Sequence, residues 1–263
     1  MTEQPKEITV DIRGRQVTVL KTGQGDPLLY LHGAFAHQEW PDFLDILSQS
    51  YSVYMPICPG FKDPSELDAI DDILDLSLYY LDLIEALSIE SPVIIGHYFG
   101  AMIAAEMAAI CSHNIRKLIL IAPAGMWLEE APGIDYNVVP LSETRQILFH
   151  DPESNVAPHL KYDVEAAVEK AALHIERVRA LSVVGKFLWP IPDKGLSKRI
   201  GRIKVPILVV CGQSDKIVPP AHGKALVDLT TNGRLEIVPD SGHLIYMEKP
   251  GQILESVSKF IDE

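Results

Sequence analysis

The chain has 263 residues, of which 47% are hydrophobic and 22% are charged. Its formal net charge of -13 at pH 7 argues against nucleic-acid binding and against attachment to anionic membranes, because both need a cationic surface. No apolar run approaches the roughly 20 residues of a membrane-spanning helix, and the polar N-terminus shows no signal-peptide pattern, so we expect a cytoplasmic protein.

The first third of the chain predicts a hairpin followed by buried strands and helices. Apolar and polar residues alternate on both sides of Gly14, which predicts a β-hairpin. The continuous apolar runs at 27–33 and 51–60 are typical of strands buried on both faces. Helical spacing at 37–49 separates these two runs, and a second helix is predicted at 66–87. That second helix places five apolar residues on one face: Ile70, Ile73, Leu74, Leu81 and Ile84.

The rest of the chain continues the alternation of strands and helices. A helix is predicted at 100–111, and another closes the chain at 250–263. Four further segments predict strands: 92–96, 117–123, 206–212 and 234–239. This alternation predicts an α/β protein with a doubly wound, mostly parallel sheet that has helices on both faces.

One interval interrupts this alternation, because no convincing buried strand lies between Met126 and Lys204. Its strongest pattern is a helix at 163–182, with apolar residues on one face at Val164, Ala167, Ala171, Ile175, Val178 and Leu181. We predict a core made of residues 1–127 and 204–263, with a helical insertion at 128–203 on the rim of the sheet.

The three cysteines, Cys58, Cys111 and Cys211, lie far apart in the sequence. Their odd number and the lack of a CxxC pair favour free thiols in a reducing compartment and give no indication of a metal site.

Polar groups follow four of the predicted strands, where open α/β sheets bind their ligands. The first two groups are His32-Gly33-Ala34-Phe35 and Gly96-His97-Tyr98-Phe99-Gly100. Asp215 follows the third strand, and Gly242-His243 follows the fourth. Each group alone is weak evidence for a site, whereas their order and strand context together indicate an active site on one edge of the sheet.

The order of these groups resembles the α/β-hydrolase fold superfamily over nearly the whole chain. Positions 98, 215 and 243 match its order of nucleophile, acid and histidine. The stretches "GQSDKIVPP" and "DSGHLIYMEKPGQ" are similar to the acid and histidine loops of esterase, haloperoxidase-like and C–C-bond hydrolase members. The resemblance implies that 128–203 is a helical lid and that the backbone N–H groups of Ala34 and Phe99 form an oxyanion hole. It also implies a small apolar ester-like substrate and no cofactor, in a monomer or homodimer.

In this scheme His243 is the general base and later the general acid, because an imidazole pKa near 6.5 serves both directions. Asp215 orients the histidine and stabilises its protonated form. Glu129 or Glu130, after the strand at 117–123, is a rival for the acid.

His32 and His97 are interpreted as structural hydrogen-bonding groups rather than as catalysts. Phe35, Trp127 and Trp189 are the predicted pocket residues.

Tyr98 is the departure from the pattern, because a serine stands at this position in the G-x-S-x-G turn. Moving its proton to an imidazole costs roughly 5 kcal/mol, which does not exclude a tyrosine nucleophile. The hydroxyl, however, lies about 6.5 Å from its Cα against about 2.4 Å for serine, and a displacement of about 1 Å can lower a rate about 100-fold. Geometry therefore outweighs acidity.

Three hypotheses follow from this departure. The chain is a hydrolase scaffold whose ordinary activity is reduced or altered by Tyr98, an enzyme that uses Tyr98 as nucleophile or proton donor, or a small-ligand binding protein on the same fold.

Overall fold

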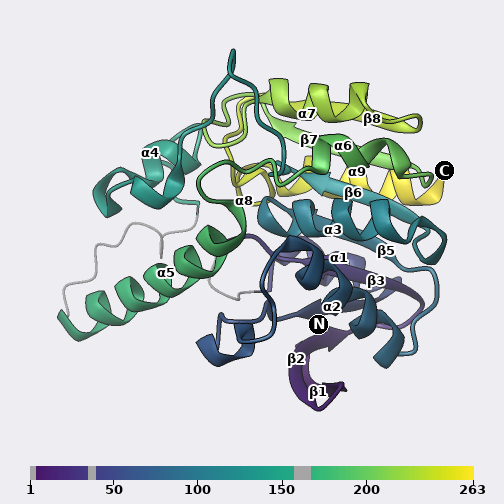
Figure 1. The fold of residues 1–263 in the computed structure, drawn as a ribbon. Helices are drawn as coiled ribbons and strands as arrows, with labels where there is room; N and C mark the ends of the chain where they lie inside the picture. The colour runs from purple at the N-terminus through teal and green to yellow at the C-terminus, as the bar shows by residue number, and fades with distance from the viewer. Residues whose placement is uncertain (1–3, 35–39, 157–166) are drawn as a thin grey trace.

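The computed structural model of the chain describes residues 4–34, 40–156 and 167–263 (Figure 1). Its strands form an eight-stranded sheet in the order β1-β2-β4-β3-β5-β6-β7-β8. The pairs β1·β2 and β2·β4 are antiparallel and all others are parallel, which confirms the predicted α/β class. The strands are β1 (Lys6–Ile12), β2 (Arg15–Thr22), β3 (Asp26–Leu31), β4 (Tyr51–Pro56), β5 (Val93–His97), β6 (Lys117–Ile121), β7 (Ile207–Gly212) and β8 (Gly233–Val238).

The predicted hairpin is present as β1 and β2. Their register pairs Ile12 with Arg15, so the turn consists of Arg13 and Gly14. Both turn residues have positive φ, 51° and 84°, as the two-residue turns that match the twist of a hairpin require.

Helices cover both faces of the sheet (Figure 1). On one face α1 packs beside α9, and on the other α3 lies between α2 and α6. The helices are α1 (Asp42–Leu47), α2 (Ile73–Ala86), α3 (Phe99–Ile110), α4 (Thr144–Leu148), α5 (Ala167–Leu188), α6 (Leu196–Arg199), α7 (Pro220–Asp228), α8 (Ile245–Glu248) and α9 (Pro250–Asp262). Short 3-10 helices are η1 (Pro64–Leu67), η2 (Ser112–Asn114), η3 (Tyr136–Val138), η4 (Leu141–Glu143) and η6 (Ile200–Arg202).

The helix predicted at 66–87 is shorter than the prediction. It begins after Asp72, whose carboxylate caps the helix by accepting the N–H groups of Leu74 and Asp75 at 2.8 and 3.0 Å. Ile70 therefore lies outside the helix, and Leu74 is 50% exposed. The capping aspartate sets the start of the helix. Ile73 and Ile84 of the predicted apolar set are buried in α2, so the predicted face is confirmed in part.

The segment between β6 and β7 contains α4, α5 and α6 and, within the described residues, no strand. Residues 157–166 of this segment, and with them Val164, lie outside the described residues. In α5 the predicted apolar face is wrong in its first part, because Ile175 and Val178 are exposed. The buried residues are at the C-terminal end instead, where α5 meets the start of α3 (Figure 1): Val183, Val184, Phe187 and Leu188. Whether 128–203 acts as a lid stays a prediction.

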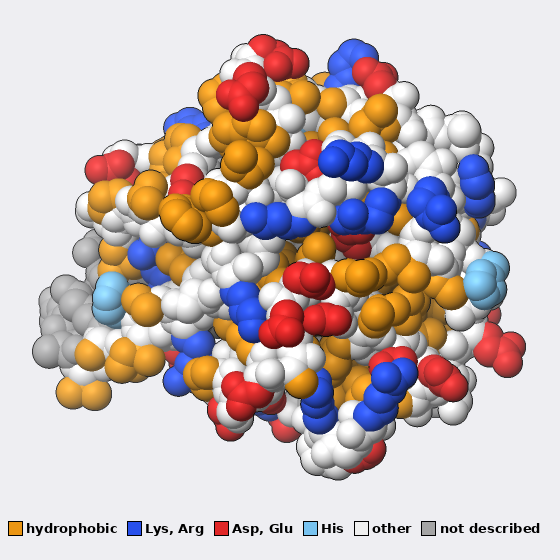
Figure 2. All heavy atoms as spheres, in the orientation of Figure 1, with side chains coloured by type: hydrophobic (Ala, Val, Ile, Leu, Met, Phe, Trp, Pro, Cys, Tyr) orange, Lys and Arg blue, Asp and Glu red, His pale blue; other side chains and the backbone are white. Residues whose placement is uncertain are grey.

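On the face drawn in Figure 2, basic and acidic side chains are interspersed with apolar ones. In the described ranges, no helix has both the length and the apolar character that crossing a membrane requires.

Candidate active site

The turn between β5 and α3 has the backbone of a nucleophile elbow, with Tyr98 at its apex. Tyr98 has φ 49° and ψ -105°. Residues other than glycine rarely adopt this backbone conformation, which costs on the order of 1–3 kcal/mol. Its N–H donates to Ile121 at 2.9 Å, and its carbonyl accepts the N–H of Ala124 at 3.1 Å. The strained turn is therefore held by β6 and by the loop that follows it.

The two glycines of the turn are required by close backbone contacts. A Cβ on Gly96 would lie 2.5 Å from the Cα of Ala101, and one on Gly100 would lie 2.0 Å from the carbonyl oxygen of Leu31. No side chain fits at either position. The glycines thus allow β5, α3 and the end of β3 to meet at one point.

Asp215 and His243 meet in the interior beside this turn. The Nδ1–H of His243 donates to Oδ2 of Asp215 at 2.8 Å, and neither side chain is exposed to solvent. A second Asp215 oxygen accepts the backbone N–H groups of Ile217 and Val218 at 2.8 and 2.9 Å. The carboxylate is therefore fixed by its own loop, and the histidine is held with Nε2 as the nitrogen that can exchange a proton.

The backbone of the histidine loop is held by groups outside the predicted site. The N–H of His243 donates to the carbonyl of Leu148 at 2.8 Å. The Glu248 carboxylate accepts the N–H of Gly242 at 2.6 Å and that of His150 at 2.9 Å. The loop is thus tied both to α8 and to the end of α4.

The ring of Tyr98 packs edge-on against the ring of His243, with centroids 4.9 Å apart and an interplanar angle of 82°. Tyr98 is 9% exposed. Burial, followed by the negative charges of Asp135 and Asp215, raises the pKa of the Tyr98 phenol well above its usual value of 10. The side chain at position 98, the predicted nucleophile position, is therefore a neutral phenol next to the histidine ring.

His32 and His97 both occupy buried positions with hydrogen bonds to the backbone. His32 Nδ1 donates to the carbonyl of Gly33 at 2.8 Å, and its Nε2 accepts the N–H of Cys58 at 3.0 Å. The Nε2 of His97 lies 3.2 Å from the carbonyl oxygen of His243. Burial lowers the pKa of both rings. The geometry fits the structural interpretation of these two histidines.

Ala34 and Phe99, whose N–H groups are the predicted oxyanion hole, lie on segments that pack together. Ala34 ends the described segment after β3, and Gly100 approaches that segment at Leu31 and His32. Phe99 is the first residue of α3, so its N–H belongs to the helix turn that has no acceptor within the helix. The Phe99 side chain is buried and stacks on Phe187 of α5, with centroids 5.6 Å apart.

Tyr98 also lines a cavity of about 90 Å³ together with Trp127 and Trp189, whereas Phe35 lies outside the described residues. Trp189 is 60% exposed, which places it at the rim. The volume is far below the roughly 300–1,000 Å³ of a typical ligand pocket. Since the Tyr98 ring is part of the wall, a smaller residue there would enlarge the space next to His243.

The rival acids do not reach the histidine. Glu129 and Glu130 are exposed, and Glu129 accepts the indole N–H of Trp127 at 2.9 Å. Asp215 holds His243 instead.

Several residues around the candidate site were not predicted from the sequence. Asp135 and His222 line the cavity, and His222 Nε2 lies 2.8 Å from the carbonyl oxygen of Ala131. Leu148 and Glu248 support the histidine loop. Of these, only Glu248 lies in a stretch that resembles a hydrolase motif, so only Glu248 could have been predicted from the sequence.

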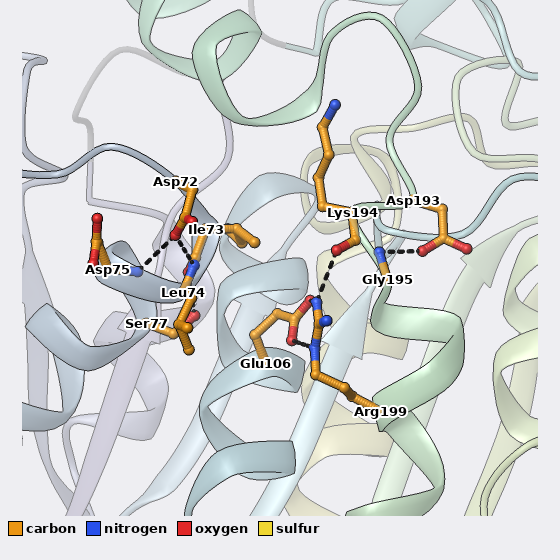
Figure 3. A network of polar contacts seen from close by, with 10 residues as sticks. All are labelled: Asp72, Ile73, Leu74, Asp75, Ser77, Glu106, Asp193, Lys194, Gly195 and Arg199. Carbon is orange, nitrogen blue, oxygen red and sulfur yellow. Dashed lines mark hydrogen bonds and ion pairs between the residues drawn. The ribbon is translucent and has the colours of Figure 1, made fainter.

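An ion pair links α3, the helix that follows the elbow, to the 194–199 stretch, which comes after the cavity residue Trp189 (Figure 3). Arg199 of α6 donates from Nε and Nη2 to the two oxygens of Glu106 on α3, at 2.7 and 2.6 Å. Nη2 also donates to the carbonyl of Lys194 at 2.9 Å. Glu106 is 2% exposed. This two-point contact fixes the 194–199 stretch against α3.

For a metal, three or more suitable ligands would have to be grouped, and no such group of His, Cys, Asp or Glu occurs in the portion of the chain that the structure describes.

Comparison with known proteins identifies a family that matches most of the chain. The family model described as the alpha/beta hydrolase family matches residues 28–256. The 2-hydroxy-6-oxo-6-(2'-aminophenyl)hexa-2,4-dienoic acid hydrolase of Metapseudomonas resinovorans is 25% identical over 265 residues, covering 96% of this chain and 89% of that protein. The 2-hydroxymuconate semialdehyde hydrolase of Pseudomonas sp. (strain CF600) is 25% identical over 264 residues, covering 95% of this chain and 92% of the relative.

Among solved structures, the 2-hydroxy-6-oxo-6-phenylhexa-2,4-dienoate hydrolase of Rhodococcus sp. strain RHA1 superimposes with a TM-score of 0.78 at 18% identity, covering 99% of each chain. That similarity supports the fold, and the predicted α/β-hydrolase fold is confirmed. With the family model spanning most of its length, the chain belongs to the alpha/beta hydrolase family.

Proposed function

We propose that the chain is a hydrolase scaffold for carboxylic esters or related acyl compounds in which Tyr98 reduces or alters ordinary turnover. The observation that carries this proposal is the buried hydrogen bond of 2.8 Å between His243 and Asp215, with the ring of Tyr98 against that histidine. A general base is thus oriented toward an elbow whose side chain is unsuited to the attack.

In this proposal a serine at position 98 would give its proton to Nε2 of His243 as its oxygen attacks the carbonyl carbon of the ester. The N–H groups of Ala34 and Phe99 would stabilise the resulting oxyanion. His243 would then donate that proton to the departing alcohol, and water would release the acid by the same sequence of proton transfers.

Tyr98 hinders this scheme through its size and its protonation. Its oxygen lies about 4 Å further from the backbone than a serine oxygen, and the raised pKa keeps the phenol protonated at neutral pH. The curated relatives include hydrolases of dienoic acids and semialdehydes, so cleavage of a C–C bond next to a carbonyl is included in the proposed substrate class.

The test is hydrolysis of p-nitrophenyl esters and of a 2-hydroxy-6-oxohexa-2,4-dienoate by the chain as it stands and by Tyr98→Ser. We expect a large gain for the serine form. Tyr98→Ala is the matched control, because it opens the cavity without adding a nucleophile, and it should stay inactive. A serine form that folds but gains nothing over the alanine form on either substrate class contradicts the proposal.

An enzyme that uses Tyr98 itself is a second candidate, favoured by the contact between the phenol ring and His243. Here Tyr98 donates or accepts a proton, or is acylated by the substrate. Intact-mass analysis during turnover of an activated ester tests the acylated form, since an adduct on Tyr98 is expected. For the proton-donor form, Tyr98→Phe must remove the activity.

A small-ligand binding protein is the third candidate, favoured by the cavity wall of Tyr98, Trp127 and Trp189. Thermal stabilisation by a small apolar acid, without turnover, is its expected signature, and Trp127→Ala should weaken it.

A further inference from the structure

Strand β8 forms one edge of the sheet and is open on its outer side. It pairs with β7, and no other strand of the described residues lies against it. A groove of about 410 Å³ runs between β8 and α9, lined among others by Arg234, Glu236, Ile237, Ser256 and Lys259. An open strand edge of this kind can accept a further strand.

The contacts with β7 decide which backbone groups face outward. The carbonyl of Asn232 accepts the N–H of Ile207, and the carbonyl of Val238 accepts the N–H of Gln213. Since successive residues of a strand point their N–H and C=O groups to opposite sides, the even-numbered residues of β8 face β7. The backbone groups of 233, 235 and 237 therefore face outward, available to a new strand.

Side chains on this edge have charges of opposite sign on one face. Arg234 pairs with Glu263 of α9, and Glu236 accepts the hydroxyl of Ser256 at 2.5 Å. Both charges thus lie on the α9 side of the sheet. Leu235 and Ile237 lie on the other side, where Ile237 is 47% exposed.

We propose that two copies of this chain pair antiparallel along β8, about a two-fold axis at Leu235, to form one continuous sheet. A two-fold pairing that uses the outward groups has few possible registers. An axis at 234 would place Arg234 opposite its own copy, and an axis at 236 would do the same for Glu236. Like charges directly opposite each other are destabilising.

An axis at 235 has the opposite result. It places Arg234 of each copy opposite Glu236 of the second copy, and this charge pair occurs twice. Leu235 then faces Leu235 of the second copy, and Ile237 faces Gly233. Each of these outward-facing pairs exchanges two backbone hydrogen bonds. Hydrogen-bond alternation allows this register, and charge favours it over the axes at 234 and 236.

The first experiment is sedimentation velocity of the full chain across the micromolar range. We expect a monomer–dimer equilibrium. Arg234→Glu or Glu236→Arg alone places like charges opposite each other and should weaken the dimer at least tenfold. The combined exchange R234E/E236R restores opposite charges and should recover the dimer. Each variant is checked for an unchanged melting temperature, because the single changes also remove contacts with α9.

The second experiment fixes the register by cross-linking. Leu235→Cys places two thiols on the axis, with Cα atoms about 5.5 Å apart, which suits a disulfide. Ile237→Cys is the matched control, because its two thiols would be about 14 Å apart along the strands.

A dimer linked through Cys at 235 and not through Cys at 237 supports the proposal. A chain that stays monomeric at all concentrations overturns it, as does a dimer that ignores the charge reversals and links equally at both positions.

Discussion

The two halves of the candidate site differ in how well they fit the proposed serine-type hydrolysis. On one side Asp215 and His243 form a buried, fully oriented pair. On the other side the elbow keeps its positive φ and its crowded glycines, yet presents a phenol. The backbone of the second half suits the proposed small nucleophile, whereas its side chain does not. Under the proposed function, a single side chain separates this site from a working one, and the surrounding backbone needs no rearrangement.

The largest effect is expected where the two halves must act together. In the Tyr98→Ser form, adding His243→Ala should lower the gained turnover by about 10⁴-fold or more, because the serine then has no base. Asp215→Asn should lower it by a similar factor. Ester hydrolysis under single-turnover conditions measures both. If the gained activity survived His243→Ala, the two halves would not form one site.

The backbone of the elbow is tested by Gly100→Ala. Its new Cβ would lie 2.0 Å from the carbonyl oxygen of Leu31, so we expect a loss of about 3–5 kcal/mol in unfolding free energy or failure to fold. Gly251→Ala is the matched control, because nothing lies within 4 Å of its Cβ. Urea denaturation measures the difference, and equal stabilities would contradict the crowding at Gly100.

The support behind the elbow is tested by Glu106→Gln. The change leaves the Arg199 guanidinium without its buried partner charge. Breaking a buried pair costs about 3–5 kcal/mol, and because Arg199 is partly exposed we expect about 2 kcal/mol, measured by urea denaturation. Lys224→Gln, which removes an exposed ion pair with Asp228, should change stability by less than about 0.5 kcal/mol. A similar loss of unfolding free energy in both variants would show that the buried Glu106–Arg199 pair contributes no more than an exposed one.

The smallest effect concerns pH. Burial lowers the pKa of His32 and His97, so these rings stay neutral in the folded chain while the unfolded chain takes up protons below about pH 6.5. Their contribution to stability is therefore present above pH 6.5 and lost as the pH falls.

Melting temperatures between pH 8 and 5 should decline toward acid, and His32→Gln should flatten the decline. The substitution removes at most one proton from the balance, which is at most about 1.4 kcal/mol of unfolding free energy per pH unit. His174→Gln, at an exposed position, is the control and should leave the slope unchanged. An unaltered slope in His32→Gln would contradict the assignment.

The sequence predicted the parts of this molecule that depend on local pattern. The apolar run before Gly96 and the glycines around Tyr98 predicted the elbow, because few backbones need two glycines at that spacing. Asp215 and His243 were found because each follows a strand at the same edge of the sheet.

The features that the sequence did not predict depend on contacts between distant segments. Nothing near Leu148 indicates that its carbonyl accepts the N–H of His243. Leu74 and Ile175 were placed on buried faces because apolar spacing alone cannot say where a helix starts or what lies against it. The roles of the lid segment 128–203 and of the pocket residues stay predictions.

The pair of Glu106 and Arg199 has a further consequence for how the molecule opens. It joins α3, which begins at the elbow, to the 194–199 stretch, which follows the cavity rim at Trp189. Because separating the two segments would leave the buried Glu106 carboxylate without its partner charge, we expect their amide hydrogens to exchange as one cooperative unit. Hydrogen exchange of α3 and of the 194–199 stretch should therefore change together in Glu106→Gln, although only α3 carries the substitution.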